Sequence, residues 1–114
     1  MAYNQAYVDT WRMTLAEKNV DDARIEEKKM FGGVCLMLNG NMLGGVGGTG
    51  KDQLMFRVGK ELEAEALALV GGQPVEMGGK KMGGLIFVKS EIALENMSQL
   101  VDYCLTFVGG LPPK

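Results

Sequence analysis

The sequence contains no histidine, and this absence removes several kinds of active site at once. A serine triad and a cysteine–histidine pair both use an imidazole as their base, so this chain can build neither. A zinc site would have to use carboxylates or two cysteines alone, which is an unusual ligand set. We therefore expect no catalytic residues, no metal site and no cofactor.

Cysteine is also scarce, because the chain has only Cys35 and Cys104, far apart and without a C-x-x-C spacing. No apolar leader precedes the domain and free buried cysteines are common, so we expect two free thiols, with Cys104 in the core. Long apolar runs are missing as well, and none approaches the roughly 20 residues that span a bilayer. These features predict a cytoplasmic protein without a membrane partner.

Positive charge is not in excess either, since 12 basic residues face 14 acidic ones and the formal net charge is −2. A nucleic-acid-binding domain usually carries a basic stripe, and each phosphate contact needs a placed cation. The basic residues are scattered here, apart from the pairs Lys28-Lys29 and Lys80-Lys81. Nucleic-acid binding by the isolated domain is therefore disfavoured. A weak DNA contact through these pairs and Arg24 is kept as an alternative.

What the chain does have is an ordinary globular composition, with 46% hydrophobic and 23% charged residues in 114 positions. This length predicts one domain over residues 1–114. Apolar residues spaced by three and four predict helices over 4–18, over 60–70 and after Asn96, which with Gln99 would cap the last helix. Residues 34–38, 41–46, 54–58 and 85–89 alternate as strands do.

Two weaker strands are expected beside these clear elements, an amphipathic edge strand over residues 24–31 and a short one over 74–77. Charged side chains on the first of them discourage further pairing, as is typical of a sheet edge. The clear elements follow in the order α-β-β-β-α-β-α with short connections. This order predicts an α+β fold of two layers, an antiparallel sheet with helices on one face.

The strongest local signal is the dipeptide Asn39-Gly40 between two alternating strands. Both central residues of a type I′ turn need positive φ, which Asn and Gly tolerate, so we expect a β-hairpin here. In the preceding strand Val34, Leu36 and Leu38 would point to one face, and Cys35 and Met37 to the other.

The second sheet face is the candidate interaction surface, because it would carry Cys35, Met37 and Met55 without a covering helix. Two interpretations stay open for these residues. Methionine is an adaptable filler of cores, so they could simply pack together. An apolar sheet face does not usually stay wet, so the alternative is a partner or dimer surface, with Lys28 and Lys29 beside it.

The glycine-rich stretch over residues 45–51 matches G-x-G-x-x-G and approaches a P-loop. Both motifs need a helix directly afterwards to hold a phosphate, whereas the next expected element is a strand. Asp52 also stands where a P-loop has the hydroxyl that binds magnesium. We expect residues 47–51 to be a plain connector, with a seat for a small anion or nucleotide as the alternative.

Five blocks of the sequence form a pattern together. They are residues 29–34 (Lys-Met-Phe-Gly-Gly-Val), the hairpin 38–42, the strand 54–59, Met82-Gly83-Gly84 and the terminal stretch 107–114. In this order the blocks resemble the N-terminal domain of the TfoX/Sxy family. The resemblance implies a two-layer fold related to secretion-chaperone-like domains, often dimeric. It also implies a regulator of bacterial competence genes that acts with the cyclic-AMP receptor protein. These proteins are not known as enzymes, and no catalytic residue carries over.

The resemblance and the missing catalytic sets lead to one functional hypothesis. We expect a non-enzymatic regulatory or protein-interaction domain, a homodimer with a protein partner in transcription regulation. Full-length regulators of the family have a second, C-terminal domain that resembles helix-hairpin-helix modules, whereas this sequence stops at Lys114.

Overall fold

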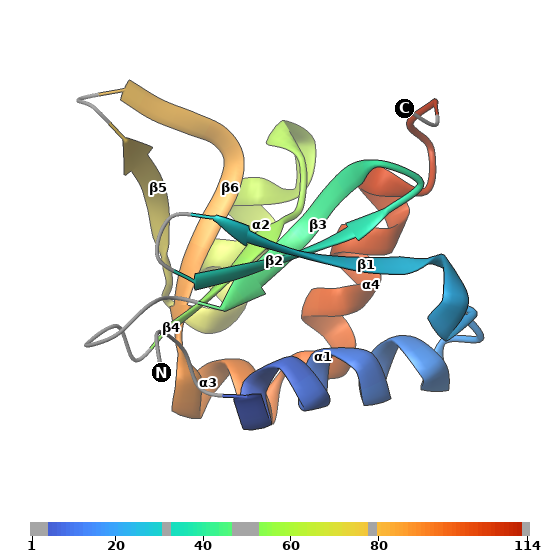
Figure 1. The fold of residues 1–114 in the computed structure, drawn as a ribbon. Coiled ribbons are helices and arrows are strands. Elements are labelled where there is room, and N and C mark those ends of the chain that lie inside the picture. The colour runs from blue at the N-terminus through green and yellow to red at the C-terminus, as the bar shows by residue number, and fades with distance from the viewer. Residues whose placement is uncertain (1–4, 31–32, 47–52, 78–79, 113–114) are drawn as a thin grey trace.

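The computed structural model describes residues 5–30, 33–46, 53–77 and 80–112, and Figure 1 shows their arrangement. The described elements are α1 (Gln5–Glu17), the 3₁₀ turn η1 (Asp22–Arg24), β1 (Ile25–Met30), β2 (Gly33–Leu38), β3 (Asn41–Val46), β4 (Gln53–Arg57), α2 (Lys60–Val70), β5 (Gln73–Met77), β6 (Lys80–Lys89), α3 (Ser90–Glu95) and α4 (Met97–Val108).

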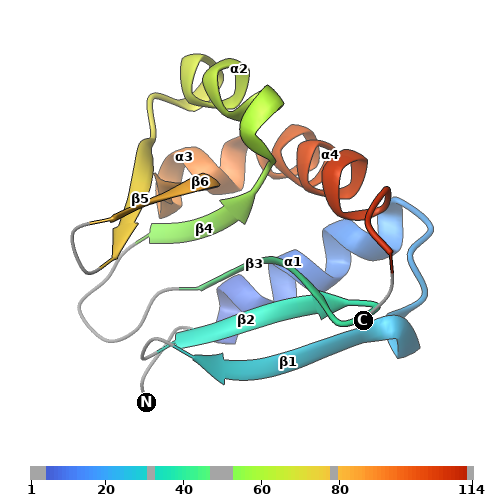
Figure 2. The same ribbon diagram turned by 90° about the horizontal axis from the view of Figure 1, so that it is seen from above.

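Six of the described segments form one sheet in the order β1-β2-β3-β4-β6-β5, and every neighbouring pair is antiparallel. All four described helices contribute side chains to one core cluster. Figure 2 shows these helices on a single face of the twisted sheet. The predicted α+β fold, with an antiparallel sheet and helices on one face, is confirmed. The charged strand β1 lies at the sheet edge, as its sequence indicated.

The hairpin between β2 and β3 has the expected geometry. Asn39 and Gly40 have φ values of 54° and 81°, and Leu38 pairs with Asn41 across the turn. Two central residues with positive φ define the type I′ turn, so this prediction is confirmed. Asn41 is buried, and its Nδ2 donates a hydrogen bond to the carbonyl of Pro112 at 2.9 Å. The hairpin thereby holds the segment that follows α4.

The last helix, α4, begins after Asn96 as predicted, but the Asn96 side chain does not cap it. Asn96 ends α3, and its side-chain amide donates to the carbonyl of Ile92 at 2.9 Å instead of accepting from the first turn of α4. Its backbone carbonyl accepts from the Leu100 amide. The side chain thus satisfies the end of one helix, and α4 begins without a side-chain cap.

The core is built around Trp11 of α1. This side chain is fully buried and stacks on Phe56 of β4, with ring centroids 5.0 Å apart. Gly44 of β3 leaves room for the indole, because a Cβ there would lie 2.7 Å from the ring. Ion pairs from Arg12 to Asp22 and Glu27, and from Lys18 to Asp102, hold α1 to η1, β1 and α4.

Candidate functional site

The three apolar residues of the predicted interaction surface do lie together. Cys35, Met37 and Met55 share a cluster with Leu85, on the sheet face opposite to the helix-covered one. Their exposed fractions are only 2–9%, and Met42 and Phe87 pack against them. Most of their apolar surface is therefore already buried within one chain, which favours the packing interpretation. A homodimer through this face stays a prediction.

The two lysines of the predicted surface are exposed but point to opposite faces of β1. Lys28 pairs with Cys35 and Lys29 with Val34, and neighbouring residues of a strand alternate between faces. Arg24 lies next to the hairpin tip, with its Nη2 3.5 Å from the Asn39 side-chain oxygen. Residues 80 and 81 begin β6, which is separated from β1 by three strands. These basic positions form no common stripe, so the structure adds no support to DNA contact.

The glycine-rich connector, residues 47–51, lies outside the described residues, so the alternative of an anion seat stays a prediction. The elements on either side are described. They are β3 and β4, two strands paired antiparallel through Gly44, Gly45 and Val46. A strand therefore follows the motif, as expected, in place of the helix that a phosphate loop needs.

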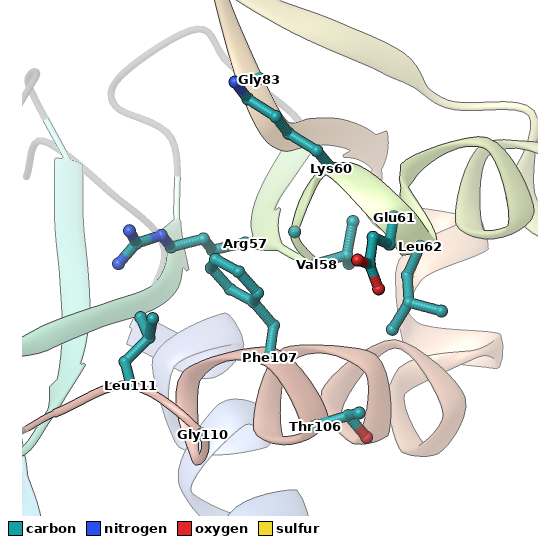
Figure 3. Close-up of a pocket in the computed structure, with 11 residues that line it drawn as sticks. Arg57, Val58, Lys60, Glu61, Leu62, Gly83, Thr106, Phe107, Gly110 and Leu111 are labelled. Carbon is teal, nitrogen blue, oxygen red and sulfur yellow. The ribbon is translucent and has the colours of Figure 1, made fainter.

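The described surface contains a cleft that the sequence did not reveal, at the point where β4, the start of α2 and the end of α4 meet (Figure 3). Its volume is about 610 Å³. It is lined by Arg57, Val58, Gly59, Lys60, Glu61, Leu62, Gly83, Thr106, Phe107, Gly110 and Leu111. The lining comes from three separate stretches of sequence, so no local pattern could have indicated it.

A rigid backbone corner forms one side of this cleft. The amides of Val58 and Gly59 both donate to the carbonyl of Gly84, at 2.8 and 3.2 Å. The Gly84 amide in turn donates to Oε1 of Glu63 in α2 at 3.1 Å. Gly59 and Gly84 both have positive φ, and a Cβ on Gly84 would lie 2.9 Å from the Gly59 backbone. Only two glycines let the end of β4 and the bend in β6 approach this closely.

Phe107 of α4 closes the cleft from the other side. A Cβ on Gly59 would lie 2.5 Å from this ring, so the glycine makes the seat in which the ring rests. The guanidinium of Arg57 lies over the same ring, 5.2 Å from its centroid. A cation above an aromatic face is attracted by the ring quadrupole, so the contact fixes the Arg57 side chain in place.

Charge is unevenly distributed around the cleft. Figure 3 shows the Arg57 guanidinium on one side of the Phe107 ring, Glu61 on the opposite side, and the Lys60 amine apart from both, beside Gly83. Among the described residues, the ion pairs are those of Arg12 and Lys18, and no carboxylate is paired with either cleft cation. The site therefore presents apolar walls and two separate positive groups that no described carboxylate neutralises.

Residues 21–106 match the TfoX N-terminal domain family. The chain belongs to this family. No curated protein and no solved structure matches the chain. The matched region of this TfoX N-terminal domain runs from the start of η1 into α4 and contains eight of the eleven lining residues, all but Phe107, Gly110 and Leu111. Most of the cleft therefore lies within the part that defines the family.

The chemistry that this TfoX N-terminal domain offers at the cleft is suited to binding. The ionisable and hydroxyl groups lining it are Arg57, Lys60, Glu61 and Thr106. The two thiols lie elsewhere, both buried. Burial raises the pKa of Cys35 and of Cys104, and a thiol with a raised pKa is a poor nucleophile. Within the residues that the structure describes, no group of three acidic or sulfur ligands could hold a metal, and no helix could cross a bilayer.

The buried thiols predict how stability depends on pH. The folded-state pKa of Cys104 lies above its ordinary value of 9.0, so above pH 9 the unfolded chain releases a proton that the folded chain keeps. Stability is then fully present below pH 9 and falls above it, by up to about 1.4 kcal/mol per pH unit for each such thiol. Urea unfolding at pH 8 and pH 10 should show this loss. The slope should be shallower in Cys104→Ala, and an equal slope in both proteins would contradict the assignment.

Proposed function

We propose that this TfoX N-terminal domain is a non-enzymatic regulatory domain that acts in the bacterial cytoplasm by binding another protein through the cleft. The observation that carries the proposal is the cleft itself. Apolar walls, a fixed arginine and an aromatic ring come together there on a rigid backbone corner.

The composition of the cleft supports protein binding. Ligand sites are typically concave and mostly apolar, with a few placed polar groups that set orientation. The apolar side chains here are Val58, Leu62, Phe107 and Leu111. Aromatic residues and arginine are also the types that contribute most to binding at protein interfaces. Phe107 and Arg57, already in contact, provide both.

The regulatory part of the proposal rests on the family. The sequence of this chain resembles the TfoX/Sxy family. Members of that family regulate competence genes together with another transcription regulator. A domain of this kind changes gene expression through the partner that it holds. We propose the same mode of action here, with competence genes as the first candidates for its targets.

The experiment is to block the cleft without unfolding the domain. Gly110 lines the cleft, and a Cβ there meets no atom closer than 3.6 Å, so Gly110→Trp should fold and fill the site. Gln99→Trp on the exposed side of α4 is the matched control. In a deletion strain of the source organism, wild type and Gln99→Trp should restore the transcript profile. Gly110→Trp should leave it at the deletion level, although its thermal unfolding is unchanged.

A further inference from the structure

The side chains that line the cleft indicate which chemical class of partner could bind there. The whole chain has a net charge of −2, yet two of the residues that line the cleft, Arg57 and Lys60, are cations. Arg57 is held over Phe107, and Lys60 is exposed with its aliphatic stem beside Gly83. Because no described carboxylate is paired with either of them, their natural complement is a negative group from outside.

Arg57 is the better placed of the two for recognising a carboxylate. Stacking on a ring occupies the face of a guanidinium and leaves the N–H groups at its edge available. A planar guanidinium can bind a carboxylate with two parallel hydrogen bonds. Among the described residues, the guanidinium donates one hydrogen bond, from Nη1 to the carbonyl of Met42 at a long 3.5 Å, so the fork is not saturated by them.

We propose that the cleft binds a segment of a partner protein in which an aspartate or glutamate lies next to an apolar residue. The carboxylate would bind Arg57, Lys60 would add positive charge to the same cleft, and the apolar side chain would pack between Phe107 and Leu62. This inference rests on the proposed function and specifies the partner's chemistry. An acidic residue complements the charge of Arg57 and Lys60, and an apolar neighbour fits the apolar walls of the cleft.

Other occupants match the cleft less well. A nucleic acid would bring a row of phosphates against only two cations and the carboxylate of Glu61, and each phosphate contact needs its own cation. A basic segment would be repelled by Arg57 and Lys60. A second copy of the chain is tested directly below.

The test is a selection of random dodecapeptides displayed on phage, with the full chain immobilised. Peptides with an acidic residue beside an apolar one should be enriched. The selected peptide should bind about tenfold more weakly to Arg57→Gln, the loss of one charge-assisted hydrogen bond. Lys60→Gln, at an exposed position, should also weaken binding, which keeps the test valid if Arg57→Gln unfolds. The exposed Lys29→Gln on β1 is the matched control and should bind as wild type.

Several outcomes would overturn this inference. They are the absence of any enriched peptide, enrichment without acidic residues, or equal losses in Lys29→Gln and Arg57→Gln. A change of sedimentation coefficient in Arg57→Gln would identify a second copy as the occupant. Peptides that bind the cleft, and are lost in Gly110→Trp, but lack acidic residues would leave the proposed function standing. Peptides that bind Gly110→Trp as tightly as wild type would count against the proposed function itself.

Discussion

Replacing Gly44 with alanine is expected to remove about 3 kcal/mol or more of the free energy of unfolding. A Cβ at this position would lie 2.2 Å from the backbone oxygen of Met55 and within 2.9 Å of two ring atoms of Trp11. Neither neighbour is a flexible side-chain end, so β3 and β4 must separate or the indole must leave its place. Overpacking usually costs about 1–3 kcal/mol, and more when the backbone has to move.

The matched control for this substitution is Gly71→Ala at the end of α2. In the described part of the chain, no atom lies within 4 Å of a Cβ built there, and the position has a φ of +63°. Its cost should come from the left-handed backbone alone, about 1 kcal/mol. Urea unfolding of both variants gives the comparison. Equal losses would show that the close approach of β3, β4 and Trp11 is not what requires glycine at position 44.

Truncating Trp11 to alanine is expected to be the second severe change, at about 3–5 kcal/mol. The side chain is fully buried, stacks on Phe56 and lies over Gly44, so its removal leaves a cavity between α1 and the sheet. A loss of this size is a large fraction of the 5–15 kcal/mol that typically separates folded and unfolded states. Thermal and urea unfolding would measure it.

Trp11→Phe separates the packing of the aromatic ring from the effect of the indole N–H group. The indole Nε1 is buried and has no hydrogen-bond partner in the described structure, which costs about 1–3 kcal/mol. Phenylalanine keeps a ring against Phe56 and removes this unsatisfied donor. We expect a net loss of only about 1 kcal/mol, since the lost packing is partly offset. A loss as large as that of Trp11→Ala would mean that the N–H group does stabilise the fold.

Several parts of the fold could be predicted from the sequence because their causes are local. Asn39-Gly40 encodes its own turn, and the alternation of residues 34–38 separates the two faces of β2 without knowledge of its neighbours. The same holds for the end of α2, where Gly71 adopts the left-handed conformation of a helix end.

The cleft and the state of the methionine face could not be predicted, because they depend on which distant segments meet. Gly59 precedes Phe107 by nearly half the chain, and nothing near either residue indicates that the ring fits against that glycine. Cys35 and Met37 were placed on the correct face, but their burial depends on packing with Leu85 from β6. The Met82-Gly83-Gly84 block contributed to the family resemblance, but the sequence did not explain why glycine stands there. The structure supplies one, since Gly84 packs against Gly59.

We propose that this domain regulates by holding a protein partner in the cleft of β4, α2 and α4. This is tested best by the transcript profile of the deletion strain carrying Gly110→Trp or Gln99→Trp at equal protein levels. We expect Gln99→Trp to restore the wild-type profile and Gly110→Trp not to restore it. Full restoration by a folded Gly110→Trp, with its cleft filled, would contradict the claim.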